Sequence, residues 1–276
     1  MNPTILVDVA ATAARAAVAV HKKYIGTVRV ESWEEKAAAD FVTHVDEEAE
    51  AVAVAAIRER FPDHAILAEE GGGAGTDSEN DSEWLWIVDP LDGTTNYLHG
   101  YPSYAASVAL AREGELIAGA VVSGVTGECW TATRGGGAFL DGRPIHVSGI
   151  TNPRHALIGT GFPFRKLELL PGYLEQFASV LPQVSGIRRA GSAAIDLCHV
   201  ATGYLDGFWE LHLAPWDIAA GTLIIREAGG KVTTVDGGPD VIARGSVLAG
   251  NPAIHRELES LIGRGSPREP TGAEWV

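Results

Sequence analysis

The segment WIVDPLDGTTN, residues 86–96, indicates both the fold and the site of this chain. Its apolar first half is typical of a buried strand, and we expect that strand to deliver Asp89 at its end. Pro90 is expected to force a turn, and Asp92 follows three residues after Asp89. Two carboxylates are therefore predicted to leave the same turn together.

The same segment continues into the start of a helix. Gly93 and Thr94 can open a short helix whose free backbone N–H groups point outward, an arrangement that holds phosphate at a helix N-terminus. An Asp-Gly-Thr triplet by itself is more often an ordinary turn with a capping threonine. The apolar strand and the Asp-Pro step before it favour an anion-binding turn instead.

The composition limits the kinds of partner that the chain can bind. Of its 276 residues 46% are apolar, which predicts a globular chain with a sizeable buried core, and the formal net charge is −15. This charge argues against a nucleic-acid groove, which needs clustered Lys and Arg. An acidic protein can hold an anionic substrate when divalent cations lie between the carboxylates. We therefore expect an acidic cluster that suits hard metal ions.

The N-terminal region predicts neither a signal peptide nor a membrane span, because Asp8 and Arg15 interrupt the apolar run over residues 5–20. The expected location is the cytoplasm, with no membrane partner. Only Cys129 and Cys198 are present, far apart in the sequence. We expect buried free thiols rather than a disulfide.

The pattern along the chain changes near residues 148–153, which predicts an N-terminal α+β part over 1–150 and a C-terminal α/β part over 151–263. The polar segments 31–39 and 71–83 are expected to be loops, and the Pro/Gly-rich tail 264–276 to be disordered. An antiparallel meander is expected in the first part and a second sheet in the other part. The predicted helices are 4–24, 46–60, 168–181, 192–202, 216–228 and 252–262, and the predicted strands are 65–68, 84–88, 105–111, 116–123, 128–133, 157–160, 207–211 and 246–249.

Three further acidic motifs accompany the turn, and each has a structural interpretation. Glu69-Glu70 ends a predicted strand, where side chains reach into a crevice, but such a pair alone is more often a solvated turn. Asp217 can be an N-terminal acid that satisfies helix donors and the helix dipole. Thr43 and Asp46 fit a capping box.

Taken together, these motifs resemble the inositol monophosphatase family, part of the magnesium-dependent, lithium-sensitive phosphatase superfamily that includes fructose-1,6-bisphosphatase. The resemblance covers nearly the whole chain and implies a layered α/β/α/β/α sandwich, with a mainly antiparallel first sheet, a mixed second sheet and the site between them. It also implies a homodimer. The motifs are LAEE (67–70), DPLDGT (89–94), WDIAAG (216–221) and EAGG (227–230), with DFVTHVD (40–46), RGGGAF (134–139) and GSAA (191–194) in the same pattern.

The resemblance implies two to three Mg²⁺ ions in the site. One is expected at Glu69, Asp89 and the backbone carbonyl of Leu91, a second at Asp89, Asp92 and Asp217, and a weaker third near Glu69. Oxygen-only ligands agree with the independent expectation for a hard cation that keeps waters and binds phosphate directly.

The implied reaction is hydrolysis of a phosphomonoester by in-line attack of a metal-activated water, without a covalent phosphoenzyme. Thr94 and Asp46 are implied to orient the water and accept its proton, beside the metal held by the catalytic Glu69. The second metal is implied to stabilise the leaving alkoxide. The backbone N–H groups of Gly93 and Thr94 are implied to hold the phosphate.

Substrate contacts are implied at Glu210 and Ala193, next to the carboxylates of Asp92 and Asp217. Glu210 can equally be a surface acid. Lys36 lies in the polar segment that closes toward the metals in relatives. The resemblance implies that Lys36 has a weak role in ordering that segment. A solvated surface lysine is the alternative.

The substrate remains open among several phosphate esters. Inositol monophosphate leads, histidinol phosphate is the runner-up, and fructose-1,6-bisphosphate or a nucleotide phosphate follow. A regulatory binding protein that retains the fold is the alternative from another class, although the intact carboxylates argue against it. His212 and the turn Phe162-Pro163-Phe164 are expected to be structural.

Overall fold

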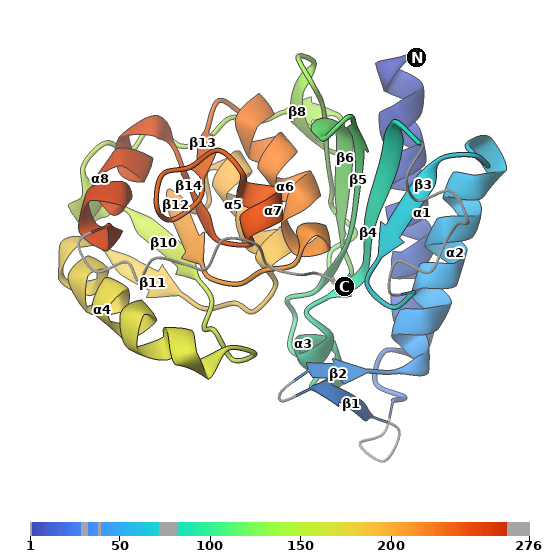
Figure 1. The fold of residues 1–276 in the computed structure, drawn as a ribbon, viewed down its shortest axis with the longest axis horizontal. Coiled ribbons are helices and arrows are strands. Elements are labelled where there is room, and N and C mark those ends of the chain that lie inside the picture. The colour runs from blue at the N-terminus through green and yellow to red at the C-terminus, as the bar shows by residue number, and fades with distance from the viewer. Residues whose placement is uncertain (1, 29–32, 38–39, 72–81, 264–276) are drawn as a thin grey trace.

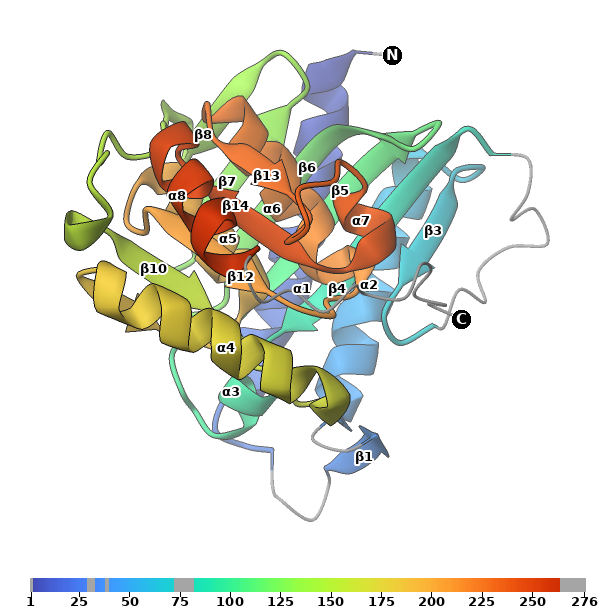
Figure 2. The ribbon, with the colours of Figure 1, turned by 60° about the vertical axis from the view of Figure 1, so that its left-hand side comes forward.

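A seven-stranded and a five-stranded β-sheet alternate with three layers of helices (Figure 1). The computed structural model describes residues 2–28, 33–37, 40–71 and 82–263. Helices α1 and α2 cover the outer face of the first sheet, α5 and α6 lie between the two sheets, and α4 and α8 cover the outer face of the second (Figure 2). The predicted α/β/α/β/α sandwich is confirmed. The helices are α1 (Pro3–Tyr24), α2 (His44–Arg60), α3 (Thr94–Leu98), α4 (Leu170–Val180), α5 (Ala193–Thr202), α6 (Pro215–Glu227), α7 (Val241–Arg244) and α8 (Pro252–Ile262).

The first sheet has seven strands in the order β3-β4-β5-β6-β7-β8-β9. Only β3 and β4 pair in parallel, and every other neighbour is antiparallel. This confirms the expected, mainly antiparallel sheet. The strands are β3 (Ala65–Ala68), β4 (Trp84–Asp92), β5 (Ala105–Arg112), β6 (Glu115–Ser123), β7 (Cys129–Thr133), β8 (Gly137–Leu140) and β9 (Arg143–Pro144).

The second sheet has five strands in the order β11-β10-β12-β14-β13. Strand β10 runs parallel to β11 and β12, whereas β14 runs antiparallel to β12 and β13. The expected mixed sheet is therefore also confirmed. The strands are β10 (Leu157–Thr160), β11 (Gly186–Arg188), β12 (Gly207–Glu210), β13 (Lys231–Thr233) and β14 (Val247–Gly250).

The outer helix layer depends on small side chains that let backbones approach closely. Ala10, Ala14 and Ala17 on α1 and Ala49 and Ala53 on α2 are fully buried, so the two helices pack against each other and onto the first sheet. Helix α1 is long and apolar enough to cross a membrane by length and composition, but half of its apolar window is buried inside the protein. Its apolar character is accounted for by packing in the core.

Two predicted loops need correction or lie outside the described residues. The segment 31–39 was expected to be a loop, but its described part forms strand β1 (Glu34–Ala37), which pairs antiparallel with β2 (Asp40–Val42). The segment 71–83 lies mostly outside the described residues, as does the tail 264–276.

Cys129 and Cys198 are buried and unpaired, as predicted.

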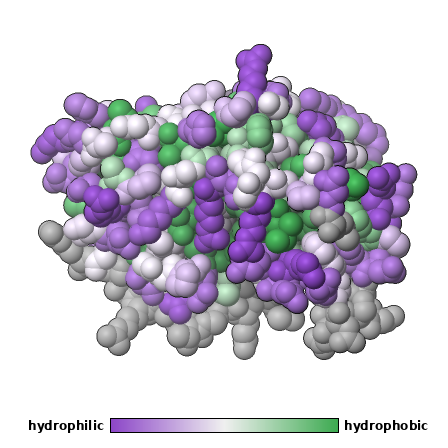
Figure 3. Space-filling model, turned by 90° about the horizontal axis from the view of Figure 1, so that it is seen from above, coloured by the Kyte–Doolittle hydropathy of each residue, from purple (hydrophilic) through white to green (hydrophobic). Residues whose placement is uncertain are grey.

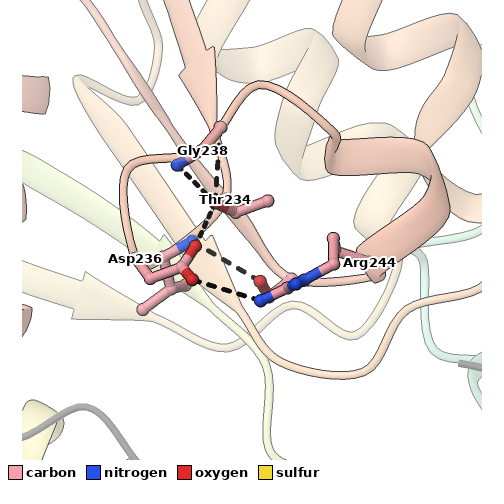
Figure 4. A network of polar contacts seen from close by, with 6 residues as sticks. Thr234, Asp236, Gly238 and Arg244 are labelled. Atoms are coloured by element: carbon pink, nitrogen blue, oxygen red, sulfur yellow. Dashed lines mark hydrogen bonds and ion pairs between the residues drawn. The ribbon is translucent and has the colours of Figure 1, made fainter. Parts of the chain in front are cut away.

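A polar network closes the loop between β13 and β14 (Figure 4). The hydroxyl of Thr234 donates to Asp236 and accepts from the Gly238 N–H at 2.7 Å, while Arg244 pairs with Asp236 at 3.2 Å. The carbonyl of Gly245, just after α7, accepts from Leu213 N–H at 2.6 Å. Leu213 lines a cavity between the two halves of the chain, so this last hydrogen bond joins the end of α7 to the wall of that cavity.

Most large apolar side chains lie between the layers, in three buried clusters. The face shown in Figure 3 is mostly hydrophilic, with small groups of apolar residues between the polar ones. This distribution agrees with the acidic composition of the chain.

Candidate active site

A cavity of about 520 Å³ opens between the two halves of the chain. Its size falls within the range of small-molecule sites. Of the predicted metal, catalytic, phosphate and substrate residues whose side chains the structure describes, all but Asp46 line it. Those lining residues are Glu69, Asp89, Leu91, Asp92, Gly93, Thr94, Ala193, Glu210 and Asp217.

A bulge in β4 brings Asp89 and Asp92 together. Asp89 pairs with Ser107 of β5 and Asp92 with Ala105, so β4 has one more residue than its partner over this stretch. In a regular strand, residues three apart point to opposite faces, and the extra residue reverses that relation. The expected turn at Pro90 is therefore wrong, because the strand continues to Asp92 and the bulge directs both acids into the cavity.

Gly93 and Thr94 follow this bulge as predicted. Gly93 has a φ of 91° and precedes α3 as its N-cap. A Cβ atom there would lie 2.9 Å from the carbonyl oxygen of Ser103. Glycine is therefore required both by the backbone conformation and by the available space.

Asp217 completes an acidic cluster that we call the acidic centre: Asp89, Asp92 and Asp217. One carboxylate oxygen from each residue lies within 4.8 Å of the others. Asp217 also accepts the N–H of Ala214 at 2.7 Å at the start of α6. Asp217 therefore both accepts a hydrogen bond at the start of α6 and belongs to the acidic centre.

The carboxylates of the acidic centre raise one another's pKa. Burial, followed by the charges of Glu69, Asp92 and Asp217, raises the pKa of Asp89 well above its usual range. Burial, followed by the charge of Asp217, raises the pKa of Asp92 to about 7. Several buried carboxylates that repel one another form a donor set suited to a hard divalent cation. The residues present therefore fit a metal ion.

Asp92 is held in place from α5. Its Oδ2 atom accepts hydrogen bonds from the Ser192 hydroxyl at 2.5 Å and the Ala194 N–H at 2.8 Å. Ala193, at which the family resemblance implies a substrate contact, is the first residue of α5. Ala193 lines the cavity, whereas the anchoring role of Ser192 was not predicted, although Ser192 is the N-cap of α5.

Thr94 links the cavity to a buried acid behind it. Its hydroxyl lies 3.0 Å from Asp46 Oδ1 and 3.0 Å from the carbonyl oxygen of Leu91. The other oxygen of Asp46 accepts from the N–H and the hydroxyl of Thr43, at 2.9 and 2.8 Å. Burial raises the pKa of Asp46. The predicted capping box is confirmed, and it also fixes Asp46 against Thr94.

Glu210 lies on the opposite wall, at the end of β12. Burial raises the pKa of its carboxyl, and the charge of Arg189 lowers it in part. The guanidinium of Arg189 also lies over the rings of Phe162 and Phe164, with its carbon 5.6 and 5.2 Å from the ring centroids. Both phenylalanines, Arg189 and His212 line the cavity.

The phenylalanine turn and His212 were expected to be structural, and the structure places them in the wall of the cavity. The sequence signal that could have placed the phenylalanine turn and Arg189 at the site is their position close to predicted elements. The turn begins two residues after the predicted strand 157–160, and Arg189 lies two residues before the GSAA motif at 191–194. The backbone of Lys36 lies in β1, and its side chain lies outside the described part of the chain.

The layered fold and the acidic cavity define a class of protein, and the comparison with known families agrees. Residues 3–265 match the Inositol monophosphatase family. The chain belongs to this family of phosphomonoester hydrolases.

The chain is similar to several known proteins over most of its length. It is 44% identical to Nus factor SuhB of Pseudomonas aeruginosa over 259 residues, covering 93% of this chain and 95% of the relative. It is 45% identical to an inositol-1-monophosphatase of Mesorhizobium japonicum over 223 residues, covering 81% and 83%. The crystal structure of the extragenic suppressor protein suhB of Bartonella henselae superposes with a TM-score of 0.87 at 39% identity, covering 95% of this chain and 100% of that one.

Proposed function

We propose that this protein hydrolyses a small-metabolite phosphomonoester with the help of Mg²⁺, and that inositol monophosphate is its leading substrate. The observation that carries the proposal is the acidic centre in a cavity next to the Thr94–Asp46 pair. A relative that carries the name inositol-1-monophosphatase supports the choice of substrate.

The acidic centre, with Glu69 and the carbonyl of Leu91, would hold the metal ions. Bound Mg²⁺ supplies positive charge that neutralises the phosphate and lowers the pKa of a water. Two metals per site, with a weaker third near Glu69, remain the expected stoichiometry.

The chain itself supplies the orientation of the attacking water and a path for its proton. When the Thr94 hydroxyl donates to Asp46, the lone pairs on its oxygen can accept a hydrogen bond from water in the cavity. As Thr94 takes a proton from that water, it can pass its own to Asp46 Oδ1. The backbone N–H groups of Gly93 and Thr94 lie at the start of α3 and are assigned to the phosphate.

Glu210 is assigned to the hydroxyl groups of the leaving group, and replacing it by alanine tests this role. Because such a contact forms in both the ground state and the transition state, Glu210→Ala is expected to raise KM for inositol 1-phosphate by about tenfold and to change kcat little. Steady-state phosphate release measures both. A large fall in kcat with KM unchanged would contradict the assignment.

The proposed function is tested by phosphate release from a panel of esters, with Mg²⁺ and with EDTA. The panel contains inositol 1-phosphate, histidinol phosphate, fructose-1,6-bisphosphate and adenosine 3′,5′-bisphosphate. We expect Mg²⁺-dependent turnover that is strongest with inositol 1-phosphate. Preference for another ester would keep the reaction and replace the substrate, and turnover that persists in EDTA would contradict the metal assignment.

A regulatory binding role is the second candidate. Relatives called Nus factor SuhB carry a name that does not refer to catalysis. Uniform inactivity across the panel, despite measurable Mg²⁺ binding, would favour this candidate. Lithium inhibition and a homodimer stay predictions from the family resemblance.

A further inference from the structure

A buried histidine on α1 contacts the bulge that carries Asp89. His21 lies in the last turn of α1 and is fully buried. Its Nε2 atom lies 2.8 Å from the carbonyl oxygen of Pro90. A carbonyl can only accept, so Nε2 carries the proton, and Nδ1 has no hydrogen-bond partner among the described residues. Burial lowers the pKa of His21 to about 4, so the ring is neutral near pH 7.

The hydrogen bond continues through one peptide group to the acidic centre. The carbonyl of Pro90 and the N–H of Leu91 belong to the same planar peptide. At its other end, the Leu91 N–H donates to Asp89 Oδ1 at 2.9 Å. The sequence of contacts is therefore His21 Nε2–H, the Pro90–Leu91 peptide and the Asp89 carboxylate. Hydrogen bonds in such a chain polarise and strengthen one another.

The bulge explains why this peptide needs support from outside its own strand. The register between β4 and β5 shifts between Asp89 and Asp92, so the residues between them have no paired residue in the β4–β5 ladder. A buried carbonyl without a partner costs free energy. His21 satisfies that carbonyl, and the backbone carbonyl of His21 accepts from the Tyr97 hydroxyl at 2.9 Å, which ties the end of α1 to α3.

We propose that His21 is a positioning residue for the proposed metal site, which fixes Asp89 through the Pro90–Leu91 peptide. Asp89 Oδ1 accepts the Leu91 N–H, so this contact restricts the orientation of the carboxylate that Asp89 contributes to the acidic centre. The inference rests on the metal site of the proposed function. It concerns a residue that does not line the cavity.

Titration of Mg²⁺ into the metal-free, full-length protein by calorimetry tests the role of His21. His21→Phe keeps an aromatic ring but removes the donor, and loss of such a supporting contact is expected to weaken Mg²⁺ binding by at least about tenfold. His21→Gln keeps an N–H donor at a similar reach and is expected to bind Mg²⁺ nearly as the wild type does.

His255 provides the matched control. It is also fully buried, its Nδ1 also lacks a partner within the part of the chain that the structure describes, and burial also lowers its pKa to about 4. Its Nε2 contacts the Thr233 hydroxyl at 2.9 Å, in the second sheet. His255→Phe is expected to lower the melting temperature and leave Mg²⁺ affinity unchanged.

The outcomes separate this inference from the proposed function. If the wild type binds Mg²⁺ and His21→Phe binds it with the same affinity, only the positioning role is overturned. A loss of Mg²⁺ affinity in His21→Gln as large as that in His21→Phe would also overturn only this role. If His255→Phe loses as much Mg²⁺ affinity as His21→Phe, the loss comes from general destabilisation and the positioning role of His21 is overturned. A wild-type chain that binds no Mg²⁺ overturns both the proposed function and the role of His21.

Discussion

Asp92→Asn is expected to lower kcat by at least about 10³-fold while the protein stays folded. Metal-assisted charge stabilisation contributes several kcal/mol to such reactions, and each 1.36 kcal/mol is tenfold in rate. Asparagine removes one charge from the acidic centre, but its amide oxygen can still accept from Ser192 and the Ala194 N–H. The measurement is Mg²⁺-dependent phosphate release, together with thermal unfolding in EDTA.

The same variant has a pH signature in the metal-free protein. Burial raises the folded pKa of Asp92 from 3.8 to about 7. The folded state therefore binds the proton more tightly than the unfolded state, and the stability that this supplies is present at low pH and lost as pH rises through about 7. In EDTA, as the pH rises from 3.8 to about 7, the unfolding free energy of Asp92→Asn should fall less than that of the wild type.

Asp196→Asn is the control for Asp92→Asn. Asp196 is also buried on α5, and burial followed by the charge of Asp92 raises its pKa to about 8, yet it does not line the cavity. We expect nearly normal turnover from it. An Asp92→Asn protein that keeps most of its activity would refute the metal assignment, and equal losses in both variants would show that any buried acid in this region matters as much.

The acids of the site could be predicted from the sequence, but their geometry could not. The apolar run before Asp89 and the motif after it identify the strand and the helix start from local chemistry alone. The bulge between Asp89 and Asp92 depends on pairing with Ser107 and Ala105, which follow in the next strand. Local signals at Pro90 therefore predicted a turn where the sheet imposes a continuous, bulged strand.

The remaining misses also come from contacts between distant segments. Strands β11 and β13 have three residues each, too few to show a period, and their positions depend on the neighbours that they pair with. The guanidinium of Arg189 packs over Phe162 and Phe164, which follow a different strand, so this contact joins residues that are distant in the sequence. In the sequence, nothing distinguishes His21 from the other residues near the end of its amphipathic helix. Its contact is with Pro90, which is 69 residues away.

Thr94→Ala is expected to lower kcat by about 10²-fold with little change in KM, since positioned proton transfer contributes at least that much. The variant removes the hydroxyl that lies within hydrogen-bond distance of both Asp46 and the Leu91 carbonyl. Thr94→Ser keeps the oxygen and should recover most of the rate. Steady-state kinetics at saturating Mg²⁺ separates kcat from KM.

Thr43→Ala distinguishes the two roles of Asp46, because it removes the capping partner and leaves Thr94 in place. Loss of this cap is expected to cost about 1 kcal/mol of stability. If Asp46 serves the reaction through Thr94, Thr43→Ala should keep a kcat close to the wild type, because Asp46 Oδ1, the atom that faces Thr94, is not the oxygen that Thr43 contacts. Full activity in Thr94→Ala, or an equal loss of kcat in Thr43→Ala, would instead mean that Asp46 only caps α2 and that the proton leaves the cavity by another route.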